Sequence, residues 1–151
     1  MPPLPLYKVR KAQLSDLEFI HQSVTAINQS NIGLNEFETL LKNKLKAVGY
    51  FIFILDAHHT TTDRAGLLIA NESQYLIDKW PMIEIQEFFI TPKFRKLGAA
   101  DFMYSYLENF AKDKNAYKMK VSCKINSTLN QNFYTSRGFK ISKKQYLKPV
   151  Y

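Results

Sequence analysis

A chain of 151 residues, of which 46% are hydrophobic, has enough apolar material for one packed domain, and this excludes an intrinsically disordered protein. Its single cysteine, Cys123, excludes an internal disulfide and a zinc site built from several cysteines. The formal net charge of +8 at pH 7 indicates an anionic partner without specifying its class.

The first residues predict a loose tail followed by a strand. Residues 1–6 are rich in proline and lack the basic and apolar regions of a signal peptide. No apolar run reaches the roughly 18 residues that a membrane-spanning helix needs, so we expect a cytoplasmic protein without a membrane partner. Residues 7–11 alternate between polar and apolar side chains and predict the first strand. We expect residues 1–151 to form a single domain.

Two helices are expected next. Ser15 and Glu18 have the spacing of a capping box, which predicts a helix start at Ser15. The apolar residues that follow at helical spacing are Leu17, Ile20, Val24 and Ile27. Asn35 is a candidate N-cap for the second helix, and Gly49 lies just after its expected end. The apolar positions of this second helix are Phe37, Leu40, Leu41 and Leu45.

The middle of the chain predicts strands. Residues 50–55 form a continuous apolar and aromatic run, typical of a strand buried on both faces. The polar residues 56–63 then predict a hairpin loop, and residues 65–70 the returning strand. Residues 82–91 predict another strand, which ends before Pro92 because proline cannot donate a backbone hydrogen bond to a neighbouring strand.

The last third predicts alternating helices and strands. A helix should begin at Gly98, with an apolar stripe formed by Ala99, Phe102, Met103, Tyr106 and Phe110. Residues 117–123 predict a strand, residues 129–136 a short helix with Gly138 as its C-cap, and residues 139–147 a last strand. This order of elements is typical of an α/β or α+β fold with a mixed sheet.

Several familiar catalytic motifs are missing from the sequence. It contains no phosphate-binding P-loop, no G-x-G-x-x-G, no H-E-x-x-H and no G-x-S-x-G pattern. The adjacent His58 and His59 lie in a polar segment and are interpreted as solvated residues, and His21 as a structural residue of the first helix. Cys123 lies in an expected strand, where a small core residue is the simpler interpretation than a nucleophile.

The segment between residues 92 and 100 has features of an anion site. A strand passes through a turn into a helix, and the first N–H groups of a helix have no partner inside it. Gly98 allows close approach of the backbone, Ala100 keeps the first turn narrow, and Arg95 and Lys96 add positive charge. Taken by itself, this segment fits equally well an ordinary strand-to-helix turn that carries basic side chains on the surface.

Two sequence elements resemble the GCN5-related N-acetyltransferases, the GNAT family. Arg95-x-x-Gly98-x-Ala100 is similar to the family's Q/R-x-x-G-x-G/A element, although Lys96 occupies a position that is commonly Gly. Residues 132–139, Asn-Phe-Tyr-Thr-Ser-Arg-Gly-Phe, resemble the downstream F-Y-x-x-x-G-F element at the expected distance. Residues 65–68 look like the strand that precedes both elements. The resemblance covers nearly the whole chain.

This resemblance implies a mixed, mostly antiparallel sheet of six or seven strands, flanked by about four helices. Acetyl-CoA would bind, without a metal, between two splayed parallel strands, here residues 82–91 and 117–123. The implied contacts to pantetheine are the backbone groups of Phe89, Ile90 and Thr91. The implied contacts to the pyrophosphate are the N–H groups of Arg95, Lys96, Leu97, Gly98, Ala99 and Ala100. Asn126 resembles the family's cofactor-contacting Asn ahead of the tyrosine helix.

The resemblance also implies direct attack of an amine on the thioester. Tyr134 matches the family's general acid, which protonates the leaving thiolate. Glu84 and Glu87 match bases of two different branches of the family. Strand alternation puts them on opposite faces, and the bulge typical of this strand in the family would re-aim one of them. A water chain without a single base is the alternative.

The resulting hypothesis is an N-acetyltransferase acting on a primary amine of a small molecule or peptide. A non-catalytic CoA-binding protein and a transferase of another acyl group are alternatives within the fold. A basic nucleic-acid-binding module is a third, which we do not favour because 17 of the 21 basic residues are lysine and only 4 are arginine. A homodimer is left open, and no motif identifies the acceptor.

Overall fold

The computed structural model describes residues 5–58, 63–125 and 127–151. It divides into two compact units, residues 1–121 and residues 122–151, which are treated separately below. The mixed α/β fold that the sequence predicts is confirmed, with helices and strands in the expected order along the chain.

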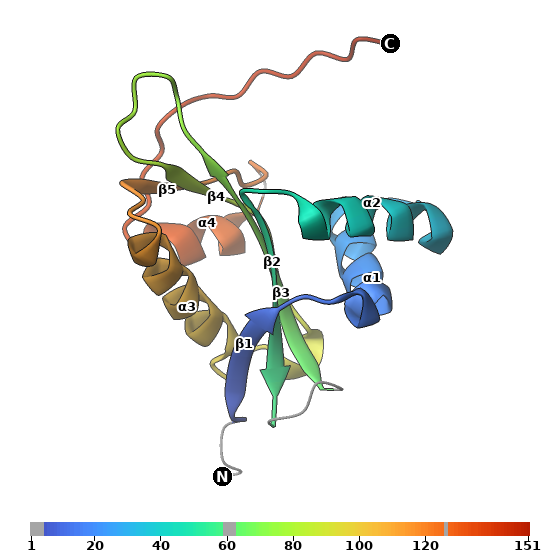
Figure 1. The fold of residues 1–151 in the computed structure, drawn as a ribbon. Helices are drawn as coiled ribbons and strands as arrows, with labels where there is room; N and C mark the ends of the chain where they lie inside the picture. Colours follow the sequence, from blue (N-terminus) through green and yellow to red (C-terminus); the bar gives the residue numbers. More distant parts are fainter. Residues whose placement is uncertain (1–4, 59–62, 126) are drawn as a thin grey trace. The chain divides into compact units, whose positions relative to one another are not determined.

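The first unit is built on a five-stranded sheet in which the spatial order of the strands follows the sequence (Figure 1). Its strands are β1 (Tyr7–Lys11), β2 (Tyr50–Ala57), β3 (Arg64–Ser73), β4 (Met82–Ile90) and β5 (Lys118–Val121). The first four strands pair antiparallel, whereas β4 and β5 are parallel. A parallel pair needs a long crossover connection, and helix α3 (Ala99–Asp113) lies in it.

Helices α1 (Leu17–Asn28) and α2 (Leu34–Lys46) cover one face of the sheet (Figure 1). Ile20 of α1 and Leu41 of α2 are buried, as the 3.6-residue periodicity predicts, but Leu40 of the predicted stripe keeps 48% of its surface exposed. The buried core beneath them consists of Ile20, Leu41, Ile52, Ile54, Leu67 and Ile69. None of the helices in the described residues combines the length and the apolar character needed to cross a bilayer.

Helix α3 covers the opposite face, where Phe53 of β2 packs edge-on against Tyr106 and Phe110. The apolar stripe is rotated relative to the sequence prediction. Phe102 keeps 43% of its surface exposed and lies beside Tyr7 at a ring distance of 5.7 Å. The buried positions of the helix are Ala99, Met103, Tyr104, Leu107 and Ala111.

The second unit contains the short helix α4 (Thr128–Thr135). The predicted strand at residues 139–147 is wrong, because residues 139–151 form neither helix nor strand. Ile141, Tyr146 and Leu147 are between 84% and 97% exposed, so the alternating pattern of this segment has no core to bury into. The sheet therefore has five strands in the described residues, not six or seven.

Three local predictions are also corrected. The capping box at the start of the first helix joins Gln13 and Asp16 in a 3-10 turn, η1 (Leu14–Asp16), instead of Ser15 and Glu18. The N-cap of α2 is Gly33, not Asn35. Asp56 was expected in a hairpin loop, but it is buried within β2, where an arginine partner compensates its charge.

Candidate active site

The carboxyl-terminal half of β4 has a neighbouring strand on one side only. β4 pairs with β5 over Met82–Ile85, opposite Lys118–Val121, whereas its pairing with β3 continues to Ile90. On the side away from β3, residues 86–90 have no strand beside them in the described part of the chain. A strand side without a neighbouring strand is where an extended ligand can add as a further strand. The stretch contains the predicted contacts Phe89 and Ile90, and Thr91 follows it.

The end of β4 is held closely against β3. A Cβ atom added to Gly66 would lie 2.9 Å from the carbonyl oxygen of Phe89, so only glycine allows the two strands to approach this closely. Directly after the strand, Thr91 donates its N–H to the carbonyl of Ala65 at 2.8 Å and its hydroxyl to the carbonyl of Arg64 at 3.1 Å. These contacts fix the position of the strand end.

The two candidate carboxylates of β4 lie on the same face of the sheet. Glu87 pairs with Ile69, and Glu84 pairs with Asn71, two residues further along β3. Because residues two apart point to one face, both carboxylates project toward the face that α1 and α2 cover, where Ile69 is part of the core. Strict alternation predicts opposite faces, but a bulge adds Gln86 to β4 and brings the two together.

Each carboxylate has a different partner. Glu84 forms an ion pair with Lys120 of β5 at 3.3 Å, whereas Glu87 accepts a hydrogen bond from the side chain of Asn28 in α1 at 3.0 Å. Burial raises the pKa of the Tyr50 hydroxyl, and the negative charge of Glu87 adds to this shift, so Tyr50 stays protonated at neutral pH. The hydrogen bond from Asn28 makes Glu87 the carboxylate that is held toward α1.

The start of α3 presents free helical N–H groups, as the sequence predicts. Gly98 is the N-cap and has a φ of 80°, a left-handed conformation that favours glycine. The first hydrogen bond inside the helix runs from the N–H of Phe102 to the carbonyl of Gly98 at 3.0 Å. The N–H groups of Ala99 and Ala100 precede it and have no acceptor within the helix, so they can bind an anion.

Two N–H groups of the preceding turn are already used. Arg95 donates its backbone N–H to Pro92 at 3.2 Å, and Leu97 donates to Phe94 at 3.3 Å. The side chain of Arg95 also folds back, because its Nε donates to the carbonyl of Ile90 at 3.1 Å. Of the backbone groups predicted to bind a pyrophosphate, four have no such contact within the turn or the helix. They are the N–H groups of Lys96, Gly98, Ala99 and Ala100.

A buried ion-pair network, which no sequence pattern indicated, lies next to these elements. Asp16 is fully buried and receives hydrogen bonds from Arg10 to both carboxylate oxygens at 2.8 Å and from Arg64 at 2.8 Å. Arg10 also binds Asp56 at 2.6 Å. Burial by itself would raise the pKa of Asp16, but the bonds from Arg10, the Gln13 backbone and Arg64 lower it to about 2. The network ties β1, η1, β2 and β3 together.

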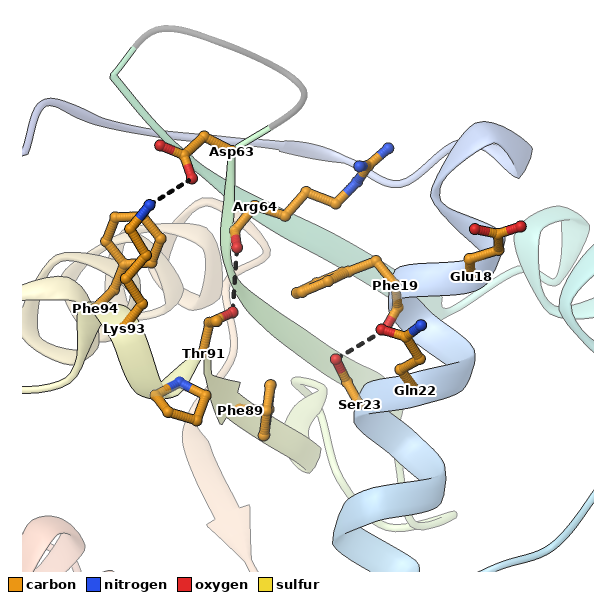
Figure 2. Close-up of a pocket in the computed structure, with 11 residues that line it drawn as sticks. Glu18, Phe19, Gln22, Ser23, Asp63, Arg64, Phe89, Thr91, Lys93 and Phe94 are labelled. Atoms are coloured by element: carbon orange, nitrogen blue, oxygen red, sulfur yellow. Dashed lines mark hydrogen bonds and ion pairs between the residues drawn. The ribbon is translucent and has the colours of Figure 1, made fainter.

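A pocket of about 460 Å³ lies between α1 and the end of β4 (Figure 2). The register of β4 against β3 places it on the face toward which both glutamates project. Its wall combines aromatic rings with a polar rim, and Lys93 and Asp63 form an ion pair at 3.9 Å on that rim. The lining residues are Glu18, Phe19, Gln22, Ser23, Asp63, Arg64, Phe89, Thr91, Pro92, Lys93 and Phe94. Because Phe89 and Thr91 line it, this pocket adjoins the predicted cofactor strand.

His21 and Cys123 are in environments that fit the structural roles predicted for them. His21 shares a hydrogen bond with the carbonyl of Ile32 at 2.8 Å and packs against the ring of Phe37. Burial raises the pKa of the Cys123 thiol above its usual value, which disfavours the thiolate and therefore a nucleophilic role. His59 lies outside the described residues.

The comparison with protein families decides the assignment. The model of the acetyltransferase (GNAT) family matches residues 35–139, a range that includes β4, the turn after it, α3 and α4. The chain belongs to the GNAT family. A search among curated proteins finds no match.

Solved structures share the GNAT fold over almost the whole chain. An aminoglycoside N-acetyltransferase, AAC(6')-Iy, in complex with CoA has a TM-score of 0.80 at 17% identity, covering 99% of this chain and 97% of that one. A GNAT family acetyltransferase of Staphylococcus aureus has a TM-score of 0.76 at 18% identity, with 95% and 98% covered. A structure titled transcriptional regulator, from Bacillus halodurans C-125, has a TM-score of 0.83 at 14% identity, with 96% and 100% covered.

The GNAT turn of this chain contains an unusual backbone conformation. Lys96, where the family commonly has Gly, has a φ of 64°. This left-handed conformation costs a non-glycine residue roughly 1–2 kcal/mol. The geometry thus explains why glycine suits the position, and it leaves an exposed lysine beside the predicted pyrophosphate site.

The downstream GNAT element lies in the second unit. Tyr134, the predicted general acid, is buried in α4. Its ring stands edge-on to Phe133 and Phe139 at centroid distances of 5.2 and 5.3 Å. The C-cap of α4 is Ser136, not the predicted Gly138, which follows two residues later with a φ of 93° that glycine adopts easily. Asn126 lies outside the described residues, so its predicted contact with the cofactor stays a prediction.

Proposed function

We propose that this protein is an acetyl-CoA-dependent N-acetyltransferase that acetylates a primary amine of a small molecule or peptide. One observation carries the proposal. The stretch of β4 beyond its pairing with β5, residues 86–90, runs directly into the turn and the start of α3, and the pocket adjoins the same end of the strand. A pantetheine arm, a pyrophosphate and an acceptor each have a matching surface there. The CoA bound to a structural neighbour supports the choice of donor.

The proposed donor site uses backbone groups of the first unit. The side of β4 that lacks a neighbouring strand near its end is proposed to pair with the amide groups of pantetheine, as an added strand would, although the carbonyl of Ile90 is already bound by Arg95. The N–H groups of Lys96, Gly98, Ala99 and Ala100 bind the pyrophosphate, helped by the positive end of the α3 dipole. Arg95 contributes mainly by fixing the turn, because its Nε already binds the carbonyl of Ile90.

The proposed reaction is a direct transfer from the thioester to the amine. The amine nitrogen forms a bond to the acetyl carbon, and the bond from this carbon to the CoA sulfur breaks. The acceptor must first lose a proton from its ammonium group, and we assign this proton to Glu87, directly or through water. Glu87 is two residues from Phe89, which lines the pocket, and projects to the pocket face. Tyr134 is proposed to protonate the leaving thiolate.

Glu84 is the second candidate for the base. It projects to the same face as Glu87, but it lies further from the pocket end of β4 and forms an ion pair with Lys120. Lys120 thus already occupies this carboxylate. We therefore give Glu84 the lesser role of shaping the charge on this face.

A calorimetric titration with acetyl-CoA tests the donor site. We expect saturable binding, and Lys96→Glu should weaken it about tenfold because it places a negative charge beside the pyrophosphate. The control is Lys46→Glu, which makes the same charge change on an exposed residue at the end of α2 and should leave binding unchanged. The absence of saturable heat with the wild-type protein would contradict the proposal.

A further inference from the structure

The connection between β3 and β4 carries an exposed apolar patch, which we call the β3–β4 tip. It consists of Tyr75, Leu76, Ile77 and Trp80 together with the neighbouring Tyr117. Leu76 and Ile77 are 103% and 93% exposed, and the three aromatic residues are about half exposed, between 45% and 55%. Figure 1 shows this connection as a long green loop extending beyond the strands. Exposed apolar and aromatic side chains gathered in one loop favour an interaction surface.

Hydrogen bonds hold the tip in shape. The carboxylate of Asp78 accepts bonds from the N–H of Tyr75 at 3.2 Å and from the hydroxyl of Tyr117 at 3.1 Å. The backbone of Asp78 donates to the carbonyl of Tyr75 at 3.0 Å and accepts from the side chain of Gln74 at 2.6 Å. The apolar side chains are therefore presented by a defined loop, and the carboxylate of Asp78 is bound by Tyr75 and Tyr117.

Lysines surround the aromatic part of the tip. Lys79 lies over the ring of Trp80 at 5.3 Å, and Lys118 lies over the ring of Tyr117 at 4.9 Å. Lys112 shares a shallow depression with both rings. This arrangement favours an anionic partner. A second copy of the same patch would bring lysines against lysines, which argues against a symmetric dimer through the tip.

We propose that the β3–β4 tip docks this protein onto an anionic lipid surface. Leu76 and Ile77 enter the boundary of the acyl chains, and the aromatic rings of Tyr75, Trp80 and Tyr117 lie at the level of the headgroups, as aromatic residues do at membrane interfaces. The lysines bind the anionic headgroups. The docking is peripheral and is independent of the proposed transferase activity, whose residues lie on β4, at the start of α3 and in α4.

Trp80 makes the proposal directly measurable, because it is the only tryptophan in the chain. The experiment follows its fluorescence as vesicles of pure phosphatidylcholine, or vesicles that also contain phosphatidylglycerol, are added to the full chain. We expect a blue shift with the anionic vesicles that weakens as salt is added. Neutralising Lys79 or Lys118 by substitution with Gln should weaken binding about fivefold each.

The matched variants are Leu76→Ser and Val48→Ser, because both residues are 103% exposed and only Leu76 belongs to the tip. Leu76→Ser should lose most of the vesicle binding, and Val48→Ser should retain it. No blue shift with anionic vesicles, or an equal loss in both variants, would overturn the proposal. So would self-association without vesicles that Leu76→Ser abolishes, since this would assign the tip to a second copy of the chain.

Discussion

The side chain of Asn28 donates a hydrogen bond to Oε1 of Glu87 at 3.0 Å, and this bond joins the end of α1 to the middle of β4. One oxygen of the carboxylate is thereby fixed, while the bulge at Gln86 directs the group to the pocket face. A base must be held in place to accept a proton from a bound amine. Glu87 has this support from α1, whereas Glu84 is paired with Lys120.

Glu87→Gln should lower the kcat for amine acetylation about 100- to 1,000-fold, the usual contribution of a general base, with little change in acetyl-CoA binding. Glu84→Gln is the matched control on the same face and should cost less than tenfold. Steady-state kinetics over a range of pH gives both values. If Glu84→Gln lowers kcat more than Glu87→Gln does, the assignment of the base is reversed. If neither substitution lowers kcat, a water chain without a single base accepts the proton.

Tyr134→Phe should lower kcat about 100-fold, because the leaving thiolate loses its proton donor, while the free energy of unfolding changes by only about 1 kcal/mol. Phenylalanine keeps the ring that packs against Phe133 and Phe139. Kinetics combined with denaturant unfolding separates the two effects. Full turnover with an unchanged pH profile would leave Tyr134 with a packing role only.

Lys96→Gly should raise the free energy of unfolding by about 0.5–1 kcal/mol. The substitution removes the cost of a left-handed lysine, part of which is offset by the greater freedom of glycine in the unfolded chain. Lys93→Gly is a useful comparison, since it removes the same charge from a residue in the η2 turn, Pro92–Phe94, and should destabilise. Thermal unfolding measures both variants. A lower stability of Lys96→Gly would show that the charge of Lys96 matters more than its backbone strain.

Asp16 gives the protein a specific acid sensitivity. Its pKa is lowered from 3.8 to about 2, so the ionised network contributes its full stability above pH 4 and loses it as the pH falls through 2. Linkage makes this contribution roughly 2 kcal/mol. Asp16→Asn should cost about 3 kcal/mol at neutral pH because Arg64 loses its charged partner and Arg10 keeps only Asp56. Denaturant unfolding at several pH values checks this, with the exposed Asp113→Asn as the control that should change little.

Local patterns in the sequence predicted most of the elements. The periodicity of apolar residues and the glycine and proline punctuation give β1, β2, β4, α1 and α3 to within a few residues, because these features act between near neighbours in the chain. Long-range contacts are not encoded in such patterns. The Asp16 network joins residues up to 48 positions apart, and neither Arg10 nor Arg64 has a local signal that indicates its partner.

The sequence predicts which residues form the candidate site, but not toward which face of the sheet their side chains point. The turn at Arg95–Ala100 follows from the sequence, since a glycine between a strand and an amphipathic helix is a local pattern. Whether Glu84 and Glu87 share a face depends on one extra residue, Gln86, and a bulge is set by the pairing with β3 rather than by the sequence of β4 alone. In the segment 139–147, the alternating pattern predicts a strand that the structure does not form, because the pattern by itself supplies no strand to pair with.

Mass spectrometry of a panel of amines incubated with acetyl-CoA and the protein tests the central claim most directly. The panel should include polyamines, aminoglycosides, amino acids and peptides. We predict that at least one primary amine gains a single acetyl group, with release of one CoA thiol per product and a rate that Glu87→Gln reduces at least 100-fold. Saturable binding of acetyl-CoA without an acetylated product from any amine would contradict the claim, and would make the protein a CoA-binding member of the family without transferase activity.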